Sequence, residues 1–240
     1  MALSNDELTK IAAVFKGPAK KRFDTALAAL LSLAWEYKYM GDTFRFDVSP
    51  DLYDRALAIC REMSDGCLDD AEKLVRTIFD EEIEMDNTAA EIAQESFDMA
   101  GSHLIELVTA WAIVAFENGF TESYTRISIV RYLNNPFASG MFGAWGKDVL
   151  KWGRGYDRNI FNQMTVIGQN LIIDAARSEE WRQMLSGGAT YYIRRRGSNF
   201  DCPTCDETCG FPIPISEPFE RTHSRCVCWP EYHYEPIPTP

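Results

Sequence analysis

The feature that most constrains this chain is a run of cysteines near its C-terminal end. Five of its seven cysteines fall between Cys202 and Cys228, together with one histidine. Cys202 and Cys205 are separated by two residues, and His223 and Cys226 repeat that spacing. Two such pairs are typical of tetrahedral zinc sites, and thiolate and imidazole ligands favour zinc over magnesium or calcium. The spacing therefore predicts a site for Zn²⁺.

This cluster offers more ligands than the four that a tetrahedral site needs. The expected ligands are Cys202, Cys205, His223 and Cys226, with Cys228 as the substitute. Cys209 lies beside the turn residue Gly210 and is interpreted as a spare thiol. A full set of protein ligands leaves no place for an activated water, so the predicted site is structural. Disulfides, or cysteines that stay reduced without a metal, are the alternative interpretations.

The rest of the chain is predicted to be mainly helical. Ser49 followed by Pro50 is a strong helix start, and Gly66 is expected to end that helix. The expected helices cover about 5–40 with a new start at Pro18, then 50–66, 68–84, 88–118 and 157–184. Residues 189–196 give the one convincing strand, because Tyr191, Tyr192 and Ile193 favour extended structure.

These elements predict an α+β fold that is predominantly α. It consists of an N-terminal helical bundle followed by a small Cys/His-rich C-terminal module with a few short strands. The expected domains are an acidic helical domain at 1–135, a Gly/aromatic connection at 136–156, a helix, strand and zinc-like module at 157–230, and a Pro-rich tail at 231–240.

Composition and charge exclude several classes of protein. Hydrophobic residues at 46% and charged residues at 25% are typical of a soluble globular chain. The N-terminal residues do not resemble a secretory signal, and the apolar run 104–116 is short for a membrane span, so we expect neither. A reducing compartment follows, where crowded cysteines are more often metal ligands than disulfides. Nearly all of the net charge of −12 lies in residues 1–150, which disfavours general nucleic-acid binding there.

Other polar residues have simpler interpretations. Arg194, Arg195 and Arg196 could hold phosphate or an acidic protein surface, or form salt bridges to the acidic helical part. His103 is expected to be a half-buried core residue and His233 a surface residue. The acidic run Glu81, Glu82 and Glu84 is expected to be a solvated face rather than a catalytic pair.

The region 190–229 resembles the signature of the phage Mu F-like head-morphogenesis family. The residues that carry the resemblance are a strand with arginines, Cys202 and Cys205, Gly210, a Pro-bearing stretch, and the ending His223, Cys226 and Cys228. The family usually has Pro after the histidine and Arg between the last two cysteines, where this chain has Ser224 and Val227. The ligand spacing is the same.

The resemblance implies a minor capsid protein of a tailed bacteriophage or prophage. Its expected partners are the portal protein and the major capsid protein, with packaged DNA contacted only locally and several copies in a larger assembly. Its expected location is the virion, at the portal vertex, after assembly in the bacterial cytoplasm. The resemblance implies a role in genome packaging or ejection and no catalytic residue.

Two other classes remain open from the residues alone. One is a zinc-binding regulatory or interaction module. The other is a zinc-knuckle nuclease, which would need His233 to activate water. The sequence contains no nucleophile elbow, P-loop or dinucleotide-binding glycine pattern, so we expect a protein that is not an enzyme.

Overall fold

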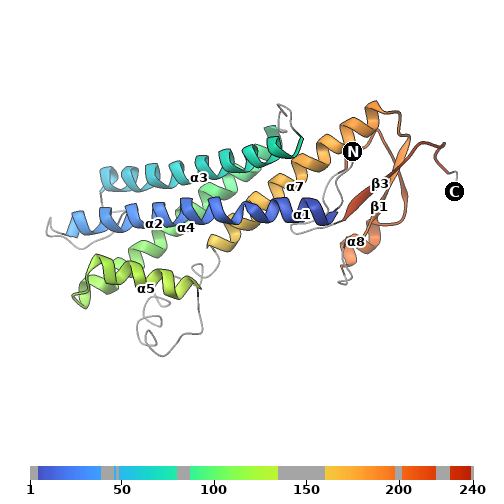
Figure 1. Ribbon diagram of the computed structural model, residues 1–240. Coiled ribbons are helices and arrows are strands. Elements are labelled where there is room, and N and C mark those ends of the chain that lie inside the picture. The colour runs from blue at the N-terminus through green and yellow to red at the C-terminus, as the bar shows by residue number, and fades with distance from the viewer. Residues whose placement is uncertain are drawn as a thin grey trace. The chain divides into compact units, whose positions relative to one another are not determined.

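The computed structural model describes residues 5–38, 46, 49–79, 87–134, 160–197, 202–219 and 228–238. Within these residues the fold is predominantly helical, with one small antiparallel sheet near the C-terminal end (Figure 1). The helices are α1 (Asn5–Val14), α2 (Lys16–Lys38), α3 (Pro50–Phe79), α4 (Asn87–Glu117), α5 (Glu122–Asn134), α7 (Ile160–Ser186) and α8 (Pro203–Thr208). The strands are β1 (Tyr191–Arg195), β2 (Pro212–Pro214) and β3 (Trp229–His233). The mainly α prediction is confirmed.

The contacts divide the chain into two compact units. The helical unit comprises Lys16–Asp70 and Ile92–Ile167, and the mixed unit comprises Met1–Phe15, Ala71–Glu91 and Gly168–Pro240. The predicted connection at 136–156 lies entirely within residues 135–159, outside the described part of the chain. The acidic run 81–84 lies outside it as well.

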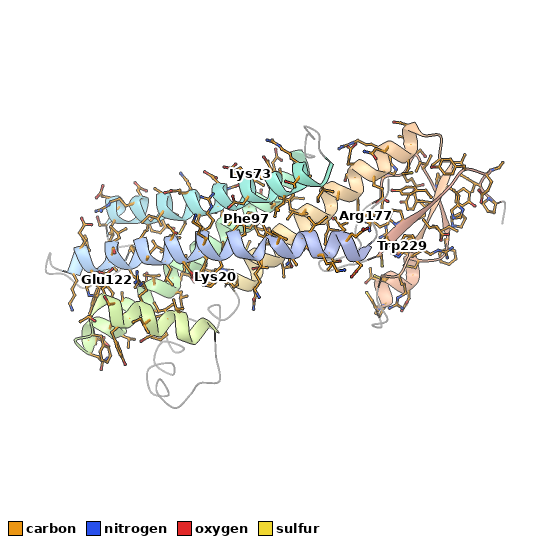
Figure 2. The ribbon with its side chains drawn as sticks, viewed as in Figure 1. Lys20, Lys73, Phe97, Glu122, Arg177 and Trp229 are labelled. Carbon is orange, nitrogen blue, oxygen red and sulfur yellow. The ribbon has the colours of Figure 1, made fainter. Side chains whose placement is uncertain are left out.

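The helical unit is held by large apolar side chains. Leu30, Leu104 and Trp111 are fully buried, as is Phe97 of α4 (Figure 2). The apolar segment Ala90–Glu117 is long and hydrophobic enough to cross a membrane, but 61% of its most apolar window is buried inside the protein. Burial on this scale is typical of a core helix, because an amphipathic or apolar helix is stabilised mainly by packing.

Helix α3 corrects one sequence prediction. It begins at Pro50 as expected, but it continues through Gly66 and ends at Phe79. A Cβ placed on Gly66 would lie only 2.6 Å from the Arg22 guanidinium carbon, so the missing side chain leaves room for Arg22. Arg22 Nε then reaches Asp70 Oδ2 at 3.0 Å. Gly66 is therefore a site of close approach between α2 and α3 rather than a helix end.

The mixed unit contains the sheet, whose strand order is β2-β1-β3 with both pairings antiparallel. The sequence predicted only the central strand specifically. Two prolines lie in β2 and one lies in β3, and proline is tolerated in strands at the edge of a sheet. The proline content of both edges explains why no clear strand pattern was visible there.

One face of the sheet packs on α7. Ala189, Tyr192, Ile215 and Phe219 form its buried cluster, with Trp181 and Met184 of α7 packed against it. The Trp181 indole Nε1 donates to the Ile215 carbonyl at 2.9 Å. On the same helix Arg177 (Figure 2) and Glu180 form a buried ion pair. Helix α7 therefore supports the sheet to which the cysteine-bearing segments are connected. The segment that contains α8 follows β1, and Cys228 directly precedes β3.

Candidate functional site: a cysteine cluster beside the sheet

Four of the cysteines are placed by short-range backbone structure. Pro203 begins α8 and leaves Cys202 at the N-terminal cap position, where Cys202 C=O accepts from Asp206 N–H at 2.9 Å. Cys205 lies within α8, and Cys209 caps its end by donating its N–H to the Cys205 carbonyl at 2.9 Å. Cys228 directly precedes β3. One short helix with its two cap positions, and the residue that precedes β3, thus supply all four side chains.

The turn after α8 attaches this segment to the sheet. Gly210 has a φ of +90°, a conformation that glycine adopts without the steric cost of a Cβ. Its N–H donates to the Arg194 carbonyl of β1 at 3.0 Å. The side chain of Arg196 forms an ion pair with Asp206 of α8. The position of α8 beside β1 is therefore fixed by both backbone and side-chain contacts.

The four cysteine side chains gather into one cluster. Cys205 and Cys228 are 4% and 6% exposed, and the half-buried Cys202 and Cys209 pack against them. Cys209 Sγ and Cys228 Sγ lie 3.9 Å apart. A tetrahedral zinc site with Zn–S bonds of about 2.3 Å has sulfurs about 3.8 Å apart, whereas a disulfide has them about 2.0 Å apart. This sulfur separation suits two ligands of one zinc ion.

The cluster has the sulfur donors that zinc prefers. The six described cysteines form no disulfide. Over the same described ranges, no three His, Cys, Asp or Glu side chains already converge on a point that could hold a metal ion. Thiolates of the described cysteines would have to rotate toward a common centre for a metal to be bound. The cluster therefore supplies the donor type that zinc prefers, but its described side chains are not arranged around a metal position.

The predicted ligands are brought together in part. Cys202, Cys205 and Cys228 meet in the cluster, whereas His223 and Cys226 lie outside the residues that the structure describes. Cys209, which the sequence interpretation set aside, belongs to the same cluster. Its signal was present in the sequence, because residues four apart share a face of a helix. The spacing from Cys205 to Cys209 has that period.

Arg194 and Arg195 of β1, and Arg196 directly after it, contact other residues of the mixed unit. Arg194 is 6% exposed, and its guanidinium lies over the Phe219 ring at 4.6 Å. Arg195 is paired with Glu231 of β3, and Arg196 with Asp206 of α8. The carboxylate that pairs with Arg195 thus comes from strand β3, and the carboxylate that pairs with Arg196 comes from α8. These ion pairs hold the sheet and α8 together.

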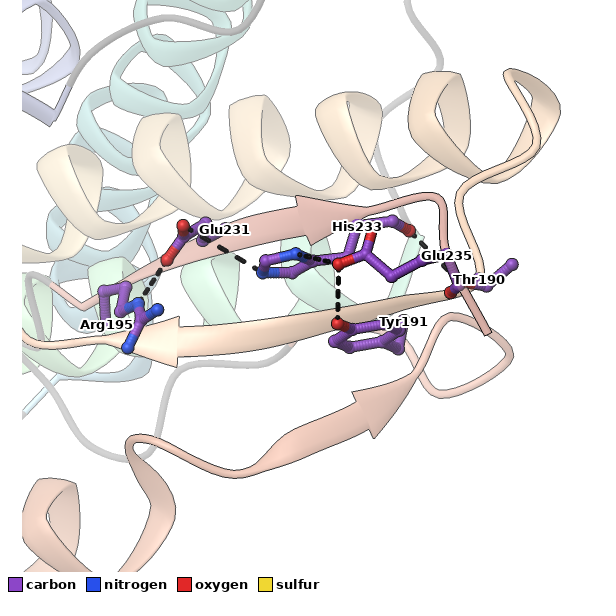
Figure 3. A network of polar contacts seen from close by, with 6 residues as sticks. All are labelled: Thr190, Tyr191, Arg195, Glu231, His233 and Glu235. Carbon is purple, nitrogen blue, oxygen red and sulfur yellow. Dashed lines mark hydrogen bonds and ion pairs between the residues drawn. The ribbon is translucent and has the colours of Figure 1, made fainter. Parts of the chain in front are cut away.

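His233 lies in a polar network on the other face of the sheet (Figure 3). Its ring stacks on Tyr191, with ring centres 4.6 Å apart. Its Nδ1 is 3.2 Å from Glu235 Oε1 and its Nε2 is 4.0 Å from Glu231 Oε1. Hydrogen bonds from the backbone and from the Tyr191 hydroxyl lower the pKa of Glu235. The expected surface histidine is therefore packed on β1 between two carboxylates.

The chain was compared with models of protein families, with curated proteins and with solved structures, and no match was found. The features of the chain that bear on its function are the sequence motif and the arrangement of the cysteine cluster. That arrangement consists of four thiols on two short segments, tied to a three-stranded sheet. Thiolates are a donor type that zinc prefers.

Proposed function

We propose that this chain is a structural minor head protein of a tailed phage or prophage, and that zinc holds its C-terminal module. The observation that carries the proposal is the gathering of Cys202, Cys205, Cys209 and Cys228 into one cluster. The resemblance to the phage Mu F-like head-morphogenesis family places a Cys/His metal site in this same segment. A zinc ion held by four protein ligands would have no coordination position for substrate, so the proposed role is structural.

The four clustered cysteines are our preferred ligands. Four thiolates suit Zn²⁺, and bound zinc supplies a cross-link between α8 and the start of β3. The ligand set predicted from the sequence, Cys202, Cys205, His223 and Cys226, is the alternative. Substitution of Cys209 and of His223, one at a time, separates the two sets, because only a true ligand changes the metal content.

A structural role is favoured over a zinc-knuckle nuclease by the position of His233. A general base must reach a water molecule or substrate with an accessible nitrogen. His233 Nδ1 faces Glu235, and the buried Nε2 atom faces Glu231 (Figure 3). The histidine required for that chemistry thus has a carboxylate 3.2 Å from Nδ1, a buried Nε2 that is 4.0 Å from the second carboxylate, and a tyrosine ring on its face.

The proposed partners are the portal and the major capsid protein, in a particle assembled in the bacterial cytoplasm. The acidic composition of residues 1–150 supports a role at the portal vertex that involves protein contacts, with any DNA contact restricted to residues 151–240. The protein would be present in several copies in that assembly and would assist packaging or ejection of the genome.

Metal analysis of full-length protein purified in reductant without added zinc tests the site. We expect one zinc per chain in the wild type and a large loss in Cys205→Ser. Cys67→Ala is the matched control, because Cys67 is fully buried in α3 and remote in sequence from the cluster. Wild-type protein with well under one zinc per chain would overturn the metal proposal.

Assembly with neighbouring gene products tests the role in the head. Co-expression with the portal and major capsid proteins encoded beside this gene should yield a complex that contains all three proteins. Protein that binds neither of them, from a gene with no portal or terminase gene nearby, would contradict the proposal and favour a host zinc-binding regulatory module.

A further inference from the structure

Cys209 and Cys228 differ from each other in a way that bears on oxidation. Their sulfurs are 3.9 Å apart, while Cys209 is half-buried and Cys228 is only 6% exposed. They come from separate segments, one at the end of α8 and one at the start of β3. A disulfide has a sulfur separation of about 2.0 Å, so the two sulfurs would have to approach by roughly 2 Å to form one.

We propose that Cys209 and Cys228 are a redox-reactive pair, which hydrogen peroxide converts to a disulfide with release of the bound zinc. The release step rests on the proposed zinc site, whereas the disulfide itself does not. The pair thereby exchanges one cross-link between α8 and β3 for another.

The chemistry begins at the more accessible thiol. The Cys209 sulfur attacks one peroxide oxygen, the O–O bond breaks, and the departing oxygen takes a proton to leave as water. Cys209 is then a sulfenic acid. The Cys228 sulfur attacks Cys209, the S–S bond forms, the S–O bond breaks, and a second water leaves. The two sulfurs together give two electrons, and one peroxide becomes two waters; the two protons come from the thiols, or from the solvent where the sulfurs were zinc-bound thiolates.

The local structure favours this order of events. Partial exposure of Cys209 admits the oxidant, and the burial of Cys228 protects its sulfur until the sulfenic acid forms beside it. Gly210 follows Cys209 in a turn with a φ of +90°, and nothing lies within 4 Å of the position of a Cβ there, so the turn has open space around it for a small movement. Cys60 and Cys67 of α3 differ from this pair, because both side chains are buried and neither is partly exposed as Cys209 is.

The exchange suits a protein that changes compartment. Disulfides are rare in a reducing cytoplasm and persist in an oxidising exterior, including the surfaces of virions. A module held by zinc during assembly in the cytoplasm would lose thiolate ligands after release from the cell. A link between Cys209 and Cys228 would keep α8 attached to the sheet at that stage.

Oxidation of the full-length, zinc-loaded protein tests the inference without any substitution. The protein is treated with increasing hydrogen peroxide, released zinc is measured with a chromogenic chelator, and disulfides are mapped by mass spectrometry of an unreduced digest. We expect a Cys209–Cys228 linked peptide as the first and major product, with one zinc released per link. Cys60 and Cys67 should remain reduced under the same treatment.

Matched variants and outcomes separate this inference from the zinc proposal. Cys209→Ser should abolish the linked peptide and Cys67→Ala should retain it. Iodoacetamide labelling of the wild type should modify Cys209 before Cys228, whether or not the variants fold. A major link between other cysteines, or over-oxidation with no link, overturns the inference. Protein that lacks zinc but forms the Cys209–Cys228 link overturns only the zinc proposal and supports the redox pair.

Discussion

Two regions of this protein bury cysteines, and they use them differently. In α3, Cys60 and Cys67 lie two helical turns apart among apolar side chains, and burial raises the pKa of each thiol to about 12. In the mixed unit, Cys205 and Cys228 are buried against other cysteines. A cysteine in an apolar helix contact acts as a small hydrophobic residue, whereas clustered cysteines offer a set of metal ligands.

The two regions also differ in how much apolar core they have. The helical unit buries many large side chains, including Trp111 and Phe97. The core of the sheet is built mainly on Ala189, Tyr192, Ile215 and Phe219. A segment with so small a core usually needs a metal, a disulfide or a larger partner surface to fold stably. We therefore expect damage to the cysteine cluster to affect the mixed unit far more than the helical unit.

The largest effect is expected from Cys205→Ser. Structural zinc in small metal-binding peptides contributes about 10–16 kcal/mol of apparent binding free energy, so loss of a buried ligand should unfold the segment 202–238. Limited proteolysis with mass spectrometry should show rapid cleavage there, while α2, α3 and α4 resist. A strong chelator added to the wild type should produce the same cleavage pattern.

The control for this prediction is Cys67→Ala, which removes a buried thiol from the other region. It creates a small cavity in α3 and should lower the free energy of unfolding by about 1 kcal/mol without new cleavage in 202–238. Equal protease resistance of Cys205→Ser and the wild type would show that the sheet and α7 hold the module without the cluster.

An intermediate effect is expected from alkaline pH on the helical unit. The pKa values of Cys60 and Cys67 are raised from 9.0 to about 12 by burial, so the folded protein keeps both protons where the unfolded chain loses them. This stabilisation is complete below pH 9 and is lost as the pH rises from 9 toward 12. The loss is about 1.4 kcal/mol per pH unit for each thiol.

Denaturant titrations of the wild type and a Cys60→Ala/Cys67→Ala double variant, at pH 8 and pH 11, isolate this contribution. The wild type should lose more unfolding free energy than the variant over that interval, because other groups titrate equally in both. Parallel losses would show that the two thiols ionise as readily in the folded protein as in the unfolded chain.

The sequence predicted the helical regions well because their signals are local. Pro50 marks the start of α3, and the apolar run of α4 marks a buried helix. It was wrong at Gly66, because a glycine within a helix is tolerated where a neighbouring side chain needs the space. Arg22 occupies that space, and its position depends on a contact between residues that are far apart in the sequence. No local pattern contains that information.

The sequence predicted which segment contains the candidate site, but it did not predict all of the residues that form it. The CxxC spacing of Cys202 and Cys205 identified the segment, and the structure brings Cys228 to it. Cys209 was missed because only the spacing of zinc ligands was considered, and not the helical period that places it near Cys205. The packing of His233 on Tyr191 also depends on strand pairing, which the proline-containing edge strands did not reveal.

A smaller effect is expected from Gly101→Ala in the helical unit. A Cβ on Gly101 would lie 2.8 Å from the Cys60 Cβ, so α3 and α4 would have to separate slightly. Overpacking of this kind typically costs about 1–3 kcal/mol. Chemical denaturation should report this loss. Gly17→Ala is the control, since nothing lies within 4 Å of its added Cβ and alanine is the better helix former. A stabilising Gly101→Ala would contradict the close helix contact.

The smallest effect is expected from Arg195→Gln, which removes an ion pair on the sheet. The Arg195 and Glu231 side chains are 42% and 39% exposed, and exposed pairs contribute about 0–1 kcal/mol because water and salt screen them. Thermal unfolding should show a small decrease in stability in low salt, and high salt should remove that decrease.

Arg177→Gln is the matched comparison, because its partner Glu180 is buried with it and would be left without its counter-ion. Breaking such a buried pair costs about 3–5 kcal/mol. Equal losses in the two variants would mean that the Arg195 pair is more shielded from water than its exposure indicates.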